Sequence, residues 1–222
     1  MTHFHIVTLF PESIEPYLNS SIIGRAIKAK KIKISFYDPK KFIYPERSRG
    51  ARAQDLRVDR RPYGGGPGMV LRPEPMLRAV QKALRRAQGK RVEKIFFSTD
   101  GAQFDEAMAQ KFSKKKDILF ICGHYEGVDA RVEKILKAKK VSVGPYVLTG
   151  GELPAATIID AVARFIPEVL GKAESLERSR VSSPEVYTRP DVLVWKGKRY
   201  RVPEVLKSGN HAKIEEWKRS RR

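Results

Sequence analysis

Three glycine-rich segments carry the residues best suited to chemistry in this chain. They read Arg61-Pro-Tyr-Gly-Gly-Gly-Pro-Gly-Met69, Cys122-Gly-His-Tyr-Glu-Gly-Val-Asp129 and Gly144-Pro-Tyr-Val-Leu-Thr-Gly-Gly-Glu-Leu-Pro154, and a shorter motif reads Ser208-Gly-Asn-His211. Because glycine has no Cβ, backbone in such turns can approach a ligand closely. Their occurrence together predicts a binding site built largely from main-chain groups.

The triple-glycine loop at 64–68 is not a standard phosphate cradle. A Walker A loop needs Gly-Lys-Ser/Thr after its glycines, whereas Met69-Val70 follows here. A Rossmann G-x-G-x-x-G between a strand and a helix is also absent. Two readings stay open: a flexible loop that closes over a bound base beside Arg60 and Arg61, or a tight surface turn.

The second glycine segment follows an apolar run, 118–122, that we expect to be a buried strand. Ligands of α/β sheets bind at the carboxyl ends of strands, which is where Gly123 falls. Tyr125 offers a stacking face, and the Glu126 carboxylate could accept hydrogen bonds from ribose hydroxyls or an amine. The alternative is a plain strand-to-helix turn in which Asp129 caps the helix.

The third glycine segment joins a predicted strand to a predicted helix. Backbone groups of 143–148 and the Gly150-Gly151 turn could hold an adenine by its Watson–Crick edge. Arg164 lies near the end of the helix that follows. Its place in the helix, between Ala163 and Phe165, favours an ordinary surface residue over a functional one.

Metal and nucleophile chemistry have no sequence signal. The four histidines, His3, His5, His124 and His211, lack ligand spacing, and the single cysteine, Cys122, cannot build a zinc cage. Nothing marks a nucleophile elbow. We therefore predict no metal site and a buried, inert cysteine.

The charge balance indicates a polyanionic partner. Lys plus Arg is 45 and Asp plus Glu is 25, so the formal net charge is +20. Nucleic acid fits best, while solvated surface lysines or an adaptation of the host would also give this balance. No apolar run approaches the roughly 18–20 residues that span a membrane. The N-terminus is typical of a first strand and not of a signal peptide, so we expect a cytoplasmic protein.

Alternating strands and helices predict an α/β fold with a largely parallel sheet. Expected strands are 3–9, 32–37, 95–98, 118–122 and 141–148, and expected helices are 11–30, 73–88, 104–112, 128–138 and 155–165. We expect a main domain over 1–170, a linker at 171–186 that carries four serines and mixed charge, and a small basic unit at 187–222.

Together these motifs resemble the bacterial tRNA (guanine-N1)-methyltransferases of the TrmD type. The resemblance covers nearly the whole chain in order. Its blocks are 9–12, 24–26, 61–69, 123–131, 143–154, 164–167, 171–172, 187–190, 202–203 and 208–211.

The resemblance implies a SPOUT-type α/β domain with a trefoil knot at roughly 95–165, a small C-terminal helical domain that binds tRNA, and an obligate homodimer. It also implies S-adenosylmethionine bound bent in the knot. The implied cofactor pocket is Phe96, Ser98, Gly101, Gly123, Tyr125, Glu126, Val143, Gly144, Tyr146, Leu148, Gly150, Gly151 and Pro154.

The implied reaction moves a methyl group to N1 of guanosine 37 in tRNA. That nitrogen carries a proton, so a general base must remove it while a cation stabilises the charge developing on O6. Arg164 matches the family arginine with the second role. The corresponding substrate contacts are Tyr63, Gly64, Gly65, Gly68, Arg189, Asn210 and His211.

The chain departs from the family pattern at the catalytic base. The family has an aspartate in the linker, whereas no Asp occurs here between Asp160 and Asp191. Glu177, or Glu174 as second choice, could supply the carboxylate. Otherwise the chain is a degenerate RNA-binding member, or a SPOUT enzyme acting on another RNA. The family also suggests Mg²⁺-dependent turnover, with no residue cluster assigned to it.

Two smaller departures from the family pattern concern single residues. His124 stands where the family usually has Arg, and Pro145 where it usually has Asp.

Overall fold

The computed structural model describes residues 1–44, 56–87, 91–170 and 185–221. The chain divides into two compact units, Met1–Leu170 and Gly171–Arg222.

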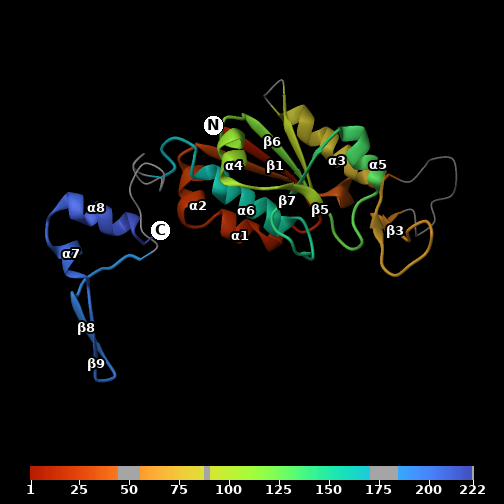
Figure 1. Cartoon of the computed structure of the whole chain (residues 1–222). Helices are drawn as coiled ribbons and strands as arrows, with labels where there is room; N and C mark the ends of the chain where they lie inside the picture. The colour runs from red at the N-terminus through yellow and green to blue at the C-terminus, as the bar shows by residue number, and fades with distance from the viewer. Residues whose placement is uncertain (45–55, 88–90, 171–184, 222) are drawn as a thin grey trace. The chain divides into compact units, whose positions relative to one another are not determined.

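The first unit is built on a five-stranded sheet in the order β2-β1-β6-β5-β7 (Figure 1). Every pairing in this sheet is parallel, which confirms the predicted fold class. The strands are β1 (Thr2–Val7), β2 (Ile32–Tyr37), β5 (Glu93–Gln103), β6 (Asp117–Ile121) and β7 (Lys139–Ser142). Both β1 and β6 are buried along their whole length, as expected for central strands covered on both faces.

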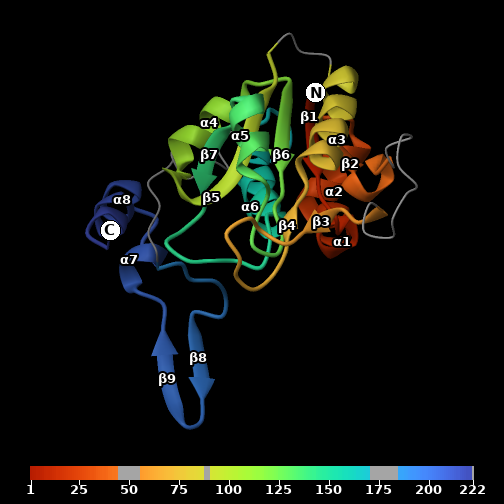
Figure 2. The same ribbon diagram turned by 90° about the vertical axis from the view of Figure 1, so that its right-hand side faces the viewer.

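Helices cover both faces of the sheet (Figure 2). One face packs around Phe4 and Phe120 against α1 (Glu15–Leu18), α2 (Ser21–Lys28), α4 (Glu106–Ser113) and α6 (Glu152–Ala163). The other face packs Val7 and Ile121 against α3 (Pro73–Arg86) and α5 (Ala130–Leu136). In α3 the buried residues include Met76, Ala79, Val80 and Ala83, at the spacing of one helical face.

The helix expected over 11–30 is wrong as a single element. It is divided into a 3₁₀ turn at Pro11–Ser13, then α1 and α2. A break at 19–20 separates α1 from α2, and a Cβ at Gly24 would collide with the Asn19 carbonyl. Glycine at this position therefore permits a close approach that helical periodicity does not reveal.

The strand expected over 141–148 is also wrong in extent. β7 ends at Ser142, and Gly144-Pro145 follow in a loop, because proline has no N–H to donate to a ladder. β5 is longer than expected and carries a bulge, since both Phe97 and Ala102 pair with Val141. Residues 98–101 lie between these two paired positions and make no pairs with β7.

A buried polar cluster joins β1, β2 and β6. The His5 ring lies 2.9 Å from the Asp117 carboxylate through Nε2 and 2.9 Å from the Tyr37 hydroxyl through Nδ1. His3 Nε2 lies 2.9 Å from the Ser35 hydroxyl. Burial lowers the pKa of both imidazoles, that of His3 to about 4. The two rings are therefore neutral near pH 7.

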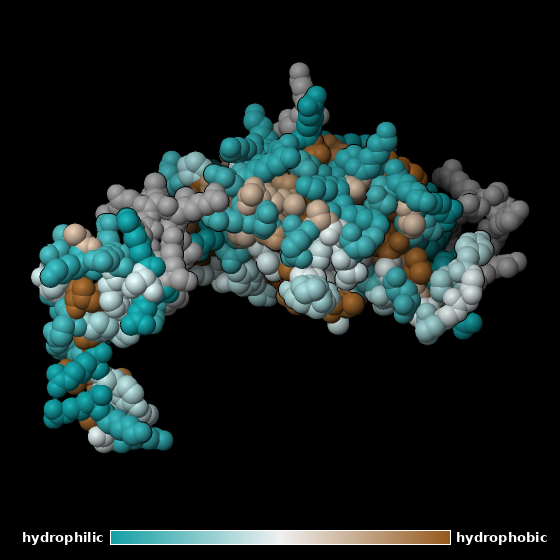
Figure 3. All heavy atoms as spheres, in the orientation of Figure 1, coloured by the Kyte–Doolittle hydropathy of each residue, from teal (hydrophilic) through white to brown (hydrophobic). Residues whose placement is uncertain are grey.

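The second unit contains a β-hairpin in addition to the expected helices. Its elements are β8 (Val192–Trp195), β9 (Lys198–Arg201), α7 (Glu204–Lys207) and α8 (His211–Arg219), and Asn210 caps α8 by accepting from Lys213 N at 3.2 Å. Figure 3 shows hydrophilic and hydrophobic residues interspersed over this unit. None of its described residues, 185–221, is buried.

The buried imidazoles predict a pH-dependent stability. As pH falls from 6.5 toward 4, unfolded chains bind protons at His3 that the folded protein does not, so the free energy of unfolding falls. His3→Asn should lose less stability than the wild type across this window. The measurement is the urea midpoint at pH 7.5 and 4.5. His211→Asn, with its exposed side chain, is the control, and parallel losses in wild type and His3→Asn would contradict the prediction.

Candidate active site

The three glycine segments meet at the carboxyl edge of the sheet, where β5, β6 and β7 end. Gly151 N donates to the Gly123 carbonyl at 3.0 Å, and an isolated bridge joins His124 to Gly150. On the other side, Glu126 N donates to the Met69 carbonyl at 3.0 Å. Segments far apart in the sequence are thus hydrogen-bonded through their main chains.

A cavity opens between the second and third segments. Its lining includes eleven residues of the predicted cofactor set: Ser98, Gly123, Tyr125, Glu126, Val143, Gly144, Tyr146, Leu148, Gly150, Gly151 and Pro154. The other two do not line it. Phe96 packs into the core beneath α3 and α5, and Gly101 lies against the β7 backbone, where a Cβ would be 2.5 Å from Val141 N.

Several lining residues are absent from the predicted cofactor set, although Val147 falls within the backbone stretch 143–148 that was expected to hold the adenine. They are Phe97, Thr99, His124, Gly127, Val141, Ser142, Val147 and Thr149. Phe97 follows from strand alternation, because Phe96 and Phe97 must face opposite sides of the sheet. The place of Thr99 in the lining depends on the bulge in β5, and the sequence carries no clear signal for that bulge.

The glycines of the site are needed for close packing. A Cβ on Gly151 would lie 2.6 Å from Cys122 Cα, and one on Gly150 would collide with His124 and Glu152. In the triple-glycine loop, Gly64 has φ +86° and Gly68 has φ +79°, the left-handed region that side chains disfavour. A Cβ on Gly68 would also collide with the Glu126 side chain.

A buried carboxylate, Glu152, contacts a residue that lines the cavity, His124. Glu152 is 4% exposed, accepts a hydrogen bond from the Thr8 hydroxyl, and lies 3.0 Å from His124 Nε2. The Phe10 ring packs edge-on against His124, with centroids 4.6 Å apart. These contacts fix the orientation of the His124 ring at the cavity.

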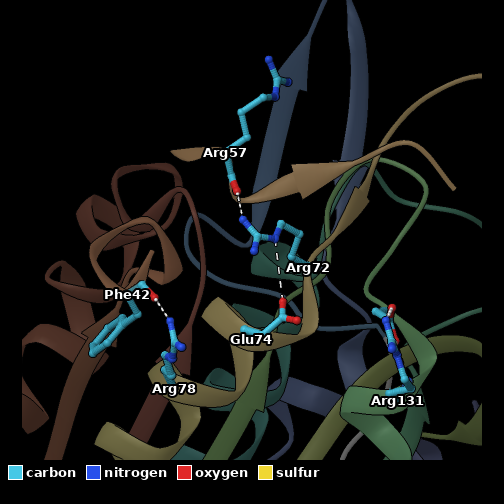
Figure 4. Close-up of polar contacts among 7 residues, drawn as sticks. Phe42, Arg57, Arg72, Glu74, Arg78 and Arg131 are labelled. Carbon is cyan, nitrogen blue, oxygen red and sulfur yellow. Dashed lines mark hydrogen bonds and ion pairs between the residues drawn. The ribbon is translucent and has the colours of Figure 1, made fainter. Parts of the chain in front are cut away.

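A second cavity adjoins the first and shares Glu126 with it. Its lining includes Tyr63, Met69, five arginines, Arg57, Arg60, Arg61, Arg72 and Arg131, and four carboxylates, Asp59, Glu74, Glu126 and Asp129. Arg57, Arg72 and Arg131 pair with Asp59, Glu74 and Asp129. Figure 4 shows how Arg72 braces this region: its Nη1 donates to the Arg57 carbonyl at 3.0 Å, and its Nε lies 3.7 Å from Glu74. Tyr63 is fully exposed.

Arg164 is not among the residues that line the first cavity. Arg164 caps the C-terminal end of α6 and lines a third cavity with Tyr17 and Asp160. Arg189, Asn210 and His211 belong to the second unit and are exposed. Glu177 and the alternative Glu174 lie outside the described residues.

Among the described residues, His3, His5 and Asp117 form a group whose possible metal-ligand atoms lie within 4.8 Å of one another. Sequence spacing did not indicate this cluster, because parallel pairing brings Asp117 beside His3. All three side chains already have partners within the protein. The cluster lies at the start of β6, the end opposite the glycine-lined cavity. In the described part of the chain, no helix is long and apolar enough to cross a membrane.

The chain is similar to known proteins over nearly its full length. The family model described as tRNA (Guanine-1)-methyltransferase TrmD matches residues 2–222. A tRNA (guanine-N(1)-)-methyltransferase of Moorella thermoacetica is 40% identical over 219 residues, covering 96% of this chain and 82% of the relative. One of the same name from Clostridioides difficile is 38% identical over 220 residues, covering 97% and 90%.

The parallel sheet, with a glycine-lined cavity at its carboxyl edge, fits an α/β methyltransferase of the SPOUT class. Within that class, the chain belongs to the TrmD family of tRNA (guanine-1)-methyltransferases. The family resemblance of the sequence is confirmed, and the family implies S-adenosylmethionine as methyl donor.

The packing of Gly151 on Cys122 can be tested through the thiol. Cys122 is 1% exposed, and burial, with a contribution from Glu152, raises its pKa well above the ordinary value. Gly151→Ala should displace the third segment and raise the rate of reaction with Ellman's reagent about tenfold or more, the factor given by about 1.4 kcal/mol of easier local opening. Thr157→Ala, on the exposed side of α6, is the control. Equal rates for all three proteins would show that this packing is not required.

Proposed function

We propose that this protein transfers a methyl group from S-adenosylmethionine to N1 of guanosine 37 in tRNA. The observation that supports this best is the pair of adjoining cavities that share Glu126. One is lined by glycine backbone, suited to a nucleoside cofactor, and the other by arginines, suited to a nucleotide of RNA. Donor and acceptor would then lie side by side.

The first cavity has the features that the cofactor requires. Main-chain groups of 143–151 would hold the adenine, because the glycines leave them accessible at close range. Tyr125 and Tyr146, each about half exposed, offer flat faces beside it. The Glu126 carboxylate would accept hydrogen bonds from ribose hydroxyls or the amino group. When bound, the cofactor supplies a methyl group on a positively charged sulfur.

The triple-glycine loop would close over the target guanosine. Its hydrogen bond to Glu126 and the antiparallel pair β3 (Asp59–Arg60) and β4 (Val70–Leu71) anchor the loop at its base, while Tyr63 is free to contact a base. Gly64, Gly65 and Gly68 give it the conformations that closure needs. Arginines beside the loop would contact the phosphates.

A homodimer would complete the site. Arg164 lies ten positions after Pro154, which corresponds to about 15 Å along a helix. Arg164 therefore does not reach the first cavity of its own chain. The surface near Arg164 includes Tyr17 and Leu153, which are 49% and 57% exposed. Pairing through this surface would bury them and offer Arg164 to the partner's substrate, where its charge would stabilise O6.

The proposal retains further family features. Segment 95–165 would form the trefoil knot that the family resemblance implies. Arg189, Asn210 and His211 would contact tRNA, although Asn210 also caps α8. Turnover would depend on Mg²⁺, and the site of action would be the cytoplasm, where tRNA is found.

Methyl transfer from labelled S-adenosylmethionine to two tRNA transcripts tests the function. One transcript has guanosine at position 37 and the other adenosine. We expect label only on the first, because the proposed chemistry needs the N1 proton and O6 of guanine. Label on neither transcript, with cofactor still bound, would show a degenerate RNA-binding member, and label on another RNA would reassign the substrate.

If Glu177 is the general base, two linker variants should differ in their rates of methyl transfer. Glu177→Gln should lower the single-turnover rate about 10²- to 10⁴-fold, the usual contribution of a general base. Glu174→Gln should leave it near the wild-type rate, and serves as the matched control. Cofactor affinity, measured by calorimetry, should be unchanged in both. Wild-type rates for both variants would remove the carboxylate of this linker from the mechanism.

A further inference from the structure

The hairpin β8–β9 exposes large side chains that no feature of the proposed site uses. Leu193, Val194, Trp195 and Tyr200 are 50–62% exposed, and every residue of β9 is exposed. A two-stranded hairpin alone is marginally stable in water. This hairpin therefore presents apolar and aromatic surface that a partner could cover.

The register of the hairpin sorts its side chains onto two faces. Leu193 lies opposite Tyr200, and Trp195 lies opposite Lys198. Directly opposed residues of an antiparallel pair point to the same face, so these four share one face. We call it the aromatic face. Val192 and Val194 lie on the other face, opposite Arg201 and Arg199.

The charge of the hairpin has a single sign. Lys196, Lys198, Arg199 and Arg201 lie within residues 192–201, and this stretch contains no acidic residue. The preceding acid, Asp191, pairs with Lys207 at 3.4 Å. An apolar protein partner would have to desolvate these cations without compensation, whereas a polyanion neutralises them.

We propose that the aromatic face of the hairpin is an RNA-binding site. Trp195 and Tyr200 stack on unpaired bases of a loop, and Lys196 and Lys198 contact the adjoining phosphates. Unpaired bases are the target because bases in an RNA duplex are already stacked, whereas loop bases can lie on aromatic rings. The inference rests on the proposed function, since tRNA is the RNA concerned, and it adds a contact surface separate from Arg189, Asn210 and His211.

The first test is tRNA affinity, measured by fluorescence anisotropy at several salt concentrations with the full chain. Trp195→Ala and Tyr200→Ala should each weaken binding about 5- to 150-fold, as expected for one lost base stack of about 1–3 kcal/mol. The dependence on salt should be unchanged in these variants. Lys198→Ala should instead lower the salt slope by about 0.7–0.9. Val194→Ala, on the opposite face and similarly exposed, is the control and should bind as the wild type does.

A second measurement uses the intrinsic fluorescence of Trp195. The chain has two tryptophans, and Trp217→Phe leaves Trp195 as the only one. Addition of tRNA should quench its emission, as stacking on a base does. In methylation assays, Trp195→Ala should raise KM for tRNA and leave kcat unchanged, because the hairpin binds substrate without touching the reacting atoms.

The outcomes separate this inference from the proposed function. If the wild type binds no tRNA, the proposed function fails. If the wild type binds tRNA and Trp195→Ala binds equally well, the hairpin proposal is overturned and the proposed function stands. If Trp195→Ala changes the sedimentation of the protein and not its RNA affinity, the aromatic face contacts another protein chain, which also overturns the proposal.

Discussion

The packing of the third glycine segment on the second is the constraint on which the site depends. Gly151 lies so close to Cys122 that no side chain fits between their backbones. This contact, with the hydrogen bond from Gly151 N to the Gly123 carbonyl, holds the loop after β7 against the loop after β6. Only in this arrangement do main-chain groups of both loops face one cavity. Because the sheet is parallel, the carboxyl ends of β5, β6 and β7 lie at the same edge, and the loops that follow them can form one site.

A buried charge accompanies this backbone packing. The Glu152 carboxylate lies at the start of α6, where the helix dipole favours negative charge, and it has Thr8 and His124 as partners. One side chain thus links the end of β1, the loop after β6 and the first turn of α6. The same charge contributes to the raised pKa of the Cys122 thiol. The first cavity and the sheet core are therefore connected through a few polar contacts and the glycines of the two loops.

Much of the fold could be predicted because its signals are local. Strands β1 and β2 follow from short apolar or alternating runs, and α3 from one apolar stripe. The failures depend on contacts that hydrophobic periodicity does not reveal: Gly24 packs on the Asn19 carbonyl five residues earlier, and the β5 bulge pairs two residues with the distant Val141. Because of the same bulge, Gly101 packs against the β7 backbone and does not line the cavity, whereas Thr99 does line it. Eleven cavity residues could be named because family motifs encode their positions, whereas the His3–His5–Asp117 cluster needs the strand register.

The sparse core of the second unit bears on the rate of turnover. None of its described residues is buried, and its helices α7 and α8 contain four and nine residues. If this unit binds tRNA as proposed, part of the contact free energy would be used to immobilise it. The net affinity would then be lower than the number of contacts suggests. Weaker net binding would in turn shorten the lifetime of the complex with methylated tRNA and favour release of the product.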